Sequence, residues 1–223
     1  MATATRTQAT VTATNGATRI LAAGVSWEFY ERFVDGLPES SAVRAAFDGE
    51  DMEIIVKGPL HEDLRALLGR FVEEVAGEVG IPFQGLGETT WKRADVERGL
   101  EADQCFYFEP AKVAAARAAL RRRENDVAAY PNPDLGIEID ISPSLIDRPA
   151  IYAALGVAEV WRFDGQTIRI DALSDVGGYQ SSPRSRFLPV AAEEIQGWIT
   201  ADDALDRPSW SRRLRDWAAI RAR

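Results

Sequence analysis

The sequence predicts one globular domain of the α/β class (α+β), in which a mixed β-sheet is flanked by helices. Three observations carry this prediction. Residues 134–141 alternate polar and apolar side chains as a strand does, and residues 61–79 form a long amphipathic helical pattern. After 141 a short helix and a second apolar strand at 157–163 follow. The 223 residues are 46% hydrophobic and 27% charged, which is ordinary for a domain with a sizeable core.

The N-terminal third is predicted to contain a tail, a helix and a hairpin. Residues 1–18 are rich in Ala and Thr without a sustained apolar face, which predicts a disordered tail. A short helix is expected at 23–34, with Ser26 as its N-cap. Apolar runs at 43–47 and 52–56 flank an Asp-Gly turn, a pattern typical of a β-hairpin.

The helix at 61–79 is the strongest helical prediction. Its apolar residues recur at spacings of three and four, and Gly80 ends it. Strands are expected at 89–93 and 103–108, followed by an Ala-rich helix at 111–123 that ends on arginines.

The strand at 134–141 has two different faces. Its apolar face carries Leu135, Ile137, Ile139 and Ile141, and its polar face carries Asp134, Gly136, Glu138 and Asp140. Asp147 is the expected N-cap of the helix that follows, and the strand at 157–163 forms a hairpin with 167–173. Helices are expected at 193–199 and 210–220. We therefore divide the chain into a tail at 1–18, a domain at 19–200 and a basic C-terminal helix within 201–223.

Charge and cysteine content exclude several classes of protein. The net charge of −9 argues against a protein that coats nucleic acid or anionic membranes nonspecifically. Cys105 is the only cysteine, which excludes an internal disulfide, and its apolar surroundings predict a buried, inert thiol. No apolar run is long enough to span a membrane, and the N-terminus has no signal core. We therefore expect a cytoplasmic protein without a membrane partner.

Three acids on strand patterns are the main candidate site. Asp103 begins one predicted strand, and Glu138 and Asp140 project from the same face of another, about 7 Å apart. Like charges this close repel, and a hard cation such as Mg²⁺ would relieve that repulsion. The alternative is an ordinary solvated face of a strand, and periodicity alone favours that alternative.

His61 is the only histidine and lies on the apolar face of its helix. A hydrogen-bonded, partly buried histidine is the more frequent outcome for such a position, with a functional role as the alternative. One histidine and one cysteine exclude a zinc site of the usual type, and no pattern brings a serine to His61 for a triad.

The order of motifs resembles a known family. Three segments carry the resemblance, namely EADQCFYF, PDLGIEIDIS about thirty residues later, and DRPAIYAALGVAEVWRFDG. Together with flanking stretches they cover about residues 25 to 200. They are similar to the Uma-type putative restriction endonucleases, a family within the PD-(D/E)XK nuclease superfamily. The resemblance implies a restriction-endonuclease-like core with a metal ion held at the edge of the sheet.

The resemblance also implies roles for individual residues. Asp103 matches the acid of the PD element, although Ala102 stands where proline is usual, and Glu138 matches the acid of the E-x-K element. Asp140 stands at the position of the superfamily's lysine. Arg148, four residues before a tyrosine, matches a lysine that substitutes for it in this family, and His61 matches a frequent histidine.

The resemblance therefore implies a metal-dependent endonuclease that hydrolyses phosphodiesters of DNA. Asp103 and Glu138 would hold Mg²⁺ or Mn²⁺, with Asp140, Arg148 and His61 completing the site. Arginine supplies a charge for phosphate but does not deprotonate as lysine can, which predicts slow catalysis. We expect DNA as substrate and a homodimer. A catalytically inert binding protein on the same fold and a metal hydrolase of another substrate are the alternatives.

Overall fold

The computed structural model describes residues 9–14, 17–38 and 42–221. Its helices are α1 (Trp27–Asp35), α2 (Pro59–Val79), α3 (Pro110–Arg121), α4 (Arg148–Ala154), α5 (Ala192–Ile199) and α6 (Arg207–Ala219), with short 3-10 turns η1 (Val127–Ala129) and η2 (Asp202–Leu205). Its strands are β1 (Ala9–Thr14), β2 (Ala17–Ala22), β3 (Val43–Phe47), β4 (Met52–Val56), β5 (Gln84–Gly85), β6 (Thr89–Arg93), β7 (Arg98–Ala102), β8 (Gln104–Tyr107), β9 (Leu135–Ile139), β10 (Glu159–Phe163), β11 (Ile168–Leu173) and β12 (Tyr179–Ser182).

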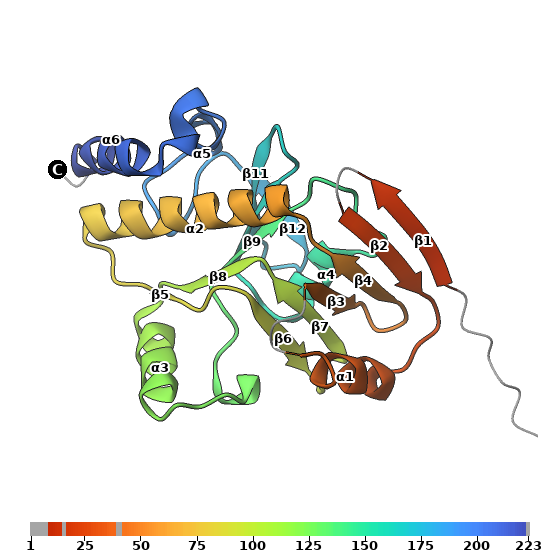
Figure 1. Ribbon diagram of the computed structural model, residues 1–223. Coiled ribbons are helices and arrows are strands. Elements are labelled where there is room, and N and C mark those ends of the chain that lie inside the picture. Colours follow the sequence, from red (N-terminus) through yellow and green to blue (C-terminus); the bar gives the residue numbers. More distant parts are fainter. Residues whose placement is uncertain (1–8, 15–16, 39–41, 222–223) are drawn as a thin grey trace, which may run out of the picture.

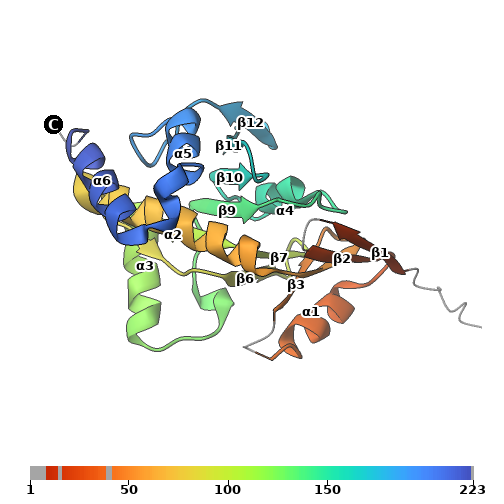
Figure 2. The same cartoon turned by 45° about the horizontal axis from the view of Figure 1, so that its top comes forward.

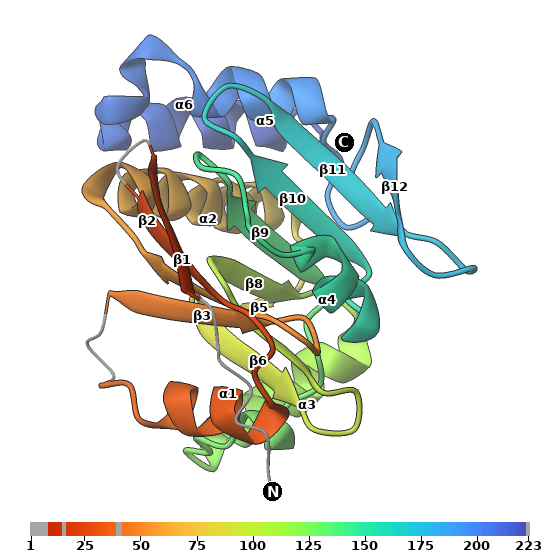
Figure 3. The same ribbon diagram turned by 90° about the vertical axis from the view of Figure 1, so that its right-hand side faces the viewer.

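The described strands form two six-stranded sheets, and the predicted α/β class is confirmed (Figure 1). The first sheet is antiparallel, in the order β1-β2-β4-β3-β7-β6. The second sheet is mixed, in the order β12-β11-β10-β9-β8-β5, because β9 and β10 run parallel. Figure 3 shows β8, β9, β10, β11 and β12 following one another in this order. This architecture is consistent with a restriction-endonuclease-like core.

Helix α2 covers one face of the second sheet, and α5 and α6 lie beside it (Figure 2). The apolar face of β9 supplies Leu135, Ile137 and Ile139 to the same buried cluster as Phe71 of α2. The predicted apolar face of this strand is therefore confirmed. Helix α2 ends at Gly80, which adopts a left-handed conformation (φ +78°), as the sequence predicts for its terminus.

The opposite face of β9 is buried, not solvated, and packs against α4. Helix α4 connects the parallel strands β9 and β10, and its N-cap is Asp147, as predicted. Its Tyr152 lies directly over Gly136, where an added Cβ would come 2.7 Å from the ring. Gly136 is therefore required for this close approach of helix to strand.

The N-terminal prediction is wrong for residues 9–14 and 17–18. These residues belong to β1 and β2, and β2 extends the first sheet by pairing with β4. The rest of the predicted tail, residues 1–8 and 15–16, lies outside the described part of the chain. Short Ala- and Thr-rich strands carry little local signal, and the pairing of β1 with β2 and of β2 with β4 supplies the missing stabilisation. The predicted hairpin of β3 and β4 and the Ser26 cap of α1 are confirmed.

Strands β5, β7 and β12 are not predicted by the sequence pattern. Strand β7 begins at Arg98, after a turn, and pairs with both β3 and β6. Its residues do not alternate clearly between polar and apolar, because both of its faces are covered: Tyr30 of α1 lies against Gly99, and Leu100 packs in one cluster with residues of α4. The predicted strand at 103–108 is β8, which begins one residue after Asp103.

Helix α6 packs along α2 and contributes to the same buried cluster through Trp210, Leu214 and Ala218. Arg207, Arg213 and Arg215 of this helix form ion pairs, the last with Glu74 at 3.1 Å. The basic C-terminal helix is thus a packed element of the domain. None of the helices in the described ranges is long and apolar enough to cross a lipid bilayer.

Candidate functional site

Asp103 lies where the two sheets join, as the single residue between β7 of the first sheet and β8 of the second. Its backbone amide donates to the Ile137 carbonyl at 3.2 Å, and its Oδ2 accepts from the Ile139 amide at 2.7 Å. The carboxylate is therefore held beside β9. Glu138 lies between those two residues, and the structure thus brings the two acids onto adjoining segments.

Two basic side chains surround the Asp103 carboxylate. Lys57, the residue directly after β4, places Nζ 2.5 Å from Oδ1, and His61 places Nε2 3.0 Å from Oδ2. All three side chains are almost entirely buried. Burial opposes ionisation, but Lys57 and His61 outweigh it and hold the pKa of Asp103 well below its usual range. Asp103 is therefore a fully paired carboxylate.

Glu138 is bound by Arg148 and Tyr152. The Nη2 of Arg148 lies 2.6 Å from Oε2 and 2.7 Å from Oε1, and Nε donates to Oε2 at 3.1 Å. The Tyr152 hydroxyl donates to Oε1. Burial raises the pKa of Glu138 to about 7, and Arg148 opposes that rise. The guanidinium of Arg148, in the first turn of α4, therefore points to Glu138, beside which the resemblance to the family places it.

A third ion pair adjoins these two and involves the N-terminal hairpin. Arg19 of β2 places Nη1 2.9 Å from Oε1 of Glu53, a residue of β4 that is completely buried. Arg19 also donates from Nε to the Ser142 hydroxyl at 2.9 Å and from Nη2 to its carbonyl at 2.8 Å. Glu53 in turn lies 4.0 Å from Nη1 of Arg148. The hairpin therefore closes one side of the site.

Asp140 is the acid without a partner at this place. Its side chain is half-buried and makes no hydrogen bond or ion pair with any residue in the described ranges. Burial raises the pKa of Asp140, while Arg148 and Arg19 oppose the rise. At this site, Asp140 is therefore a carboxylate that is not committed to a contact with the described residues.

Four site residues were missed by sequence reasoning, namely Lys57, Tyr152, Glu53 and Arg19. Lys57 and Glu53 lie on or just after β4, and Arg19 on β2, so only the pairing of these strands with their neighbours brings them to Asp103 and Glu138. For these residues the sequence offers one local indication of a site: Lys57 is a charged residue at the end of a predicted strand, four residues before His61.

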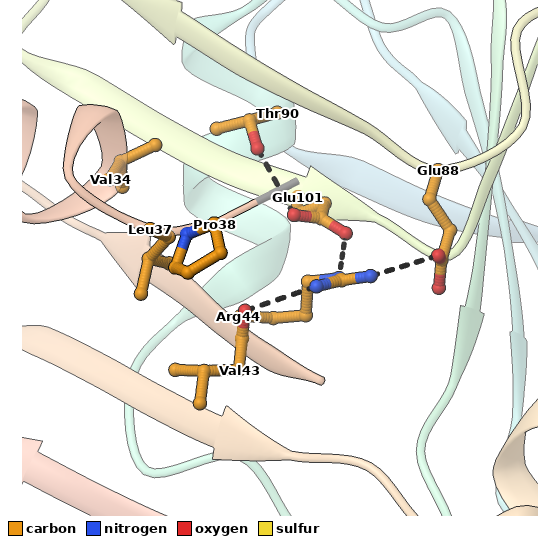
Figure 4. A pocket seen from close by; sticks show the side chains of 8 residues that line it. All are labelled: Val34, Leu37, Pro38, Val43, Arg44, Glu88, Thr90 and Glu101. Carbon is orange, nitrogen blue, oxygen red and sulfur yellow. Dashed lines mark hydrogen bonds and ion pairs between the residues drawn. The ribbon is translucent and has the colours of Figure 1, made fainter. Parts of the chain in front are cut away.

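A small cavity of about 290 Å³ opens beside the site (Figure 4). It is lined by Val34, Leu37, Pro38, Val43, Arg44, Glu88, Thr90 and Glu101. Arg44 contacts both acids of this cavity, at 3.0 Å for Glu88. Glu88 also lies 3.2 Å from Lys57, so one chain of ion pairs joins the cavity to Asp103.

As arranged, these residues do not fit a bound metal ion. Hard cations need several oxygen ligands, and the oxygens of Asp103 and Glu138 are engaged by lysine, histidine, arginine and tyrosine donors. Over the part of the chain that the structure describes, no group of three or more His, Cys, Asp or Glu side chains is placed to hold a metal. The positive charges that neutralise the acids come from the protein itself.

The family model named Uma2, described as "Putative restriction endonuclease", matches residues 27–201. A search of curated proteins finds no match to this chain. The matched region contains every site residue described above except Arg19, which lies in the hairpin that precedes it. This description suggests a nuclease in general, and restriction-endonuclease-like proteins generally use divalent metals. With most of its length matched, the chain belongs to the Uma2 family of putative restriction endonucleases.

Proposed function

We propose that the protein is a DNA phosphodiesterase whose site is built around Asp103, Glu138 and Arg148. One observation carries this proposal. Two buried carboxylates from adjoining segments of the chain are each matched by a buried cation, inside the region that matches the nuclease family. Buried charges are costly to maintain for stability alone, which supports a chemical role for this cluster.

Arg148 is the residue that we assign to the phosphate. Its Nε and Nη2 bind Glu138, whereas Nη1 makes no hydrogen bond with a residue in the described ranges. A guanidinium held on one edge can offer its other N–H groups to a phosphodiester oxygen and stabilise charge that develops there. It cannot accept a proton from water, because arginine stays protonated.

Asp140 and His61 have the supporting roles. Asp140 has no hydrogen-bond or ion-pair partner among the residues that the structure describes, and burial raises its pKa, which favours a carboxylate that accepts a proton from water. His61 holds Asp103 in place through Nε2 at 3.0 Å. Mg²⁺ or Mn²⁺ is the cofactor that we expect cleavage to require, on the basis of the family. A homodimer, with one site for each strand of a duplex, is the assembly that we propose.

A second candidate function is binding without catalysis. The observation in its favour is that Asp103, Glu138 and Arg148 are each at most 5% exposed and already neutralise one another through internal ion pairs. A site closed in this way can be a structural remnant of a nuclease on which a binding function has been built.

A cleavage assay separates the two candidates. Supercoiled plasmid, linear duplex and single-stranded DNA are incubated with Mg²⁺, with Mn²⁺ or with a chelator. We expect metal-dependent cleavage by the wild type and a loss of about a hundredfold or more in Asp103→Asn. Asp134→Asn is the matched control, since Asp134 is another buried aspartate paired with a lysine, outside the site. Cleavage that is absent in the wild type, or unchanged in Asp103→Asn, contradicts the proposal.

A further inference from the structure

We propose that Lys57 is a built-in counter-ion which competes with divalent cations for Asp103 and so weakens metal binding at this site. The inference rests on the proposed function in one respect, that Asp103 and Glu138 are the ligands that a cation would seek. The observation behind it is the disagreement between this family, whose members generally use divalent metals, and a site whose carboxylates are already neutralised.

Lys57 occupies the place of a cation at Asp103. Its Nζ lies 2.5 Å from Oδ1, and the two side chains are 5% and 2% exposed. Two charges at this distance in a poorly hydrated place attract strongly, so a second cation can bind Oδ1 only if the ammonium withdraws. Binding of a metal ion therefore has to overcome the lysine–aspartate attraction as well as the dehydration of the ion.

Lys57 is better suited to withdrawal than Arg148. Arg148 makes three hydrogen bonds to Glu138 and a fourth, at 3.1 Å, to the Glu101 carbonyl. Lys57 is a flexible chain with a second carboxylate, Glu88, at 3.2 Å from Nζ. When it leaves Asp103, the ammonium can stay paired with Glu88. Lys57 is therefore the displaceable cation of the site.

The chain contains a matched pair outside the site. Lys112 places Nζ 2.7 Å from Oδ1 of Asp134, which is 1% exposed and accepts from the amides of Phe108 and Glu109, each at 2.8 Å. Asp134 thus resembles Asp103 in its burial, its lysine and its backbone donors. It lacks the neighbouring Glu138 with which a cation could be shared.

The test measures Mn²⁺ binding to the full chain by titration calorimetry, with the paramagnetic signal of free Mn²⁺ as a second readout. Lys57→Met is expected to bind Mn²⁺ at least about tenfold more tightly than the wild type, since the competing charge is gone. Lys112→Met should bind like the wild type. Adding Asp103→Asn to Lys57→Met should abolish the gain, which locates the ion at this carboxylate.

Lys57→Gln is the second variant, because its amide still donates to Asp103 and preserves folding if methionine does not. Circular dichroism and thermal melting identify which variant is folded. Equal Mn²⁺ affinity in the wild type and a folded neutral variant overturns the inference. So does a gain that survives Asp103→Asn or that Lys112→Met reproduces. A gain in affinity without DNA cleavage by any variant leaves the inference standing and contradicts only the proposed function.

Discussion

At the scale of single residues, Glu138 and Arg148 behave as one unit. The strand pattern alone predicts that Glu138→Gln relieves repulsion among acids and leaves the fold intact or slightly more stable. The structure changes that expectation. Glu138 is 3% exposed and accepts three hydrogen bonds from Arg148, so its loss leaves a guanidinium buried without its counter-charge.

We therefore expect each single substitution to be strongly destabilising. Glu138→Gln and Arg148→Met should each lower the free energy of unfolding by about 3–5 kcal/mol. The double variant should lose much less than the sum of the two, because no isolated charge remains. Urea denaturation of the four proteins of this cycle, at a pH above the Glu138 pKa of about 7 so that its carboxyl group is ionised, measures the coupling. Additive losses would contradict a specific Glu138–Arg148 pair.

The sequence predicts which residues carry charge at the site but not how the charges are paired. The four side chains that the motifs indicate lie close together because their elements adjoin. Glu138 and Arg148 lie on β9 and α4, Asp103 bonds to the backbone of β9, and His61 lies at the start of α2. Lys57 could not be found this way. Its contact with Asp103 depends on how the first sheet joins the second, and no local periodicity encodes that junction.

At the scale of elements, the contact between β9 and α4 depends on the absence of a side chain at Gly136. Gly136→Ala would place a methyl group 2.7 Å from the Tyr152 ring, and the ring would have to move away from Glu138. We expect a loss of about 1–3 kcal/mol in unfolding free energy.

Gly77 in α2 is the matched control for that substitution. An added Cβ there meets no atom within 4 Å, so Gly77→Ala should stabilise the protein by about 1 kcal/mol through helix propensity. Thermal and urea melting of both variants make the comparison. Equal effects of the two substitutions would show that the β9–α4 contact is looser than described.

The N-terminal hairpin is an element whose importance the sequence hides. Residues 9–22 have too little apolar character to predict strands, yet Arg19 is 4% exposed and pairs with the buried Glu53. Arg19→Met should therefore destabilise the protein by about 3 kcal/mol, since Glu53 loses its nearest cation. Arg32→Met is the control, because Arg32 is exposed on α1 and its side chain hydrogen-bonds, among the residues that the structure describes, to the Glu28 carbonyl alone. Similar melting temperatures for the two variants would show that the Arg19–Glu53 ion pair contributes little to stability, which contradicts this prediction.

At the scale of the whole molecule, the fold class followed from the amphipathic α2 and from the strand–helix–strand unit at 134–163, both of which are local patterns. The first sheet as a whole did not follow. Its strands are short, and β7 shows no clear alternation because α1 and α4 cover its two faces. The consequence is functional, since Asp103 connects β7 to β8 and the two sheets supply different halves of the site.

The most direct test of this account is a pair of crystal structures grown with the same concentration of Mn²⁺, one of the wild type and one of Lys57→Met, with anomalous difference maps to locate the ion. We expect Lys57 on Asp103 and a weak anomalous peak or none in the wild type. In Lys57→Met we expect a strong peak beside Asp103 and Glu138. A strong peak there in the wild type, with Lys57 still in contact with Asp103, would contradict the claim that Lys57 competes with the metal ion for this carboxylate.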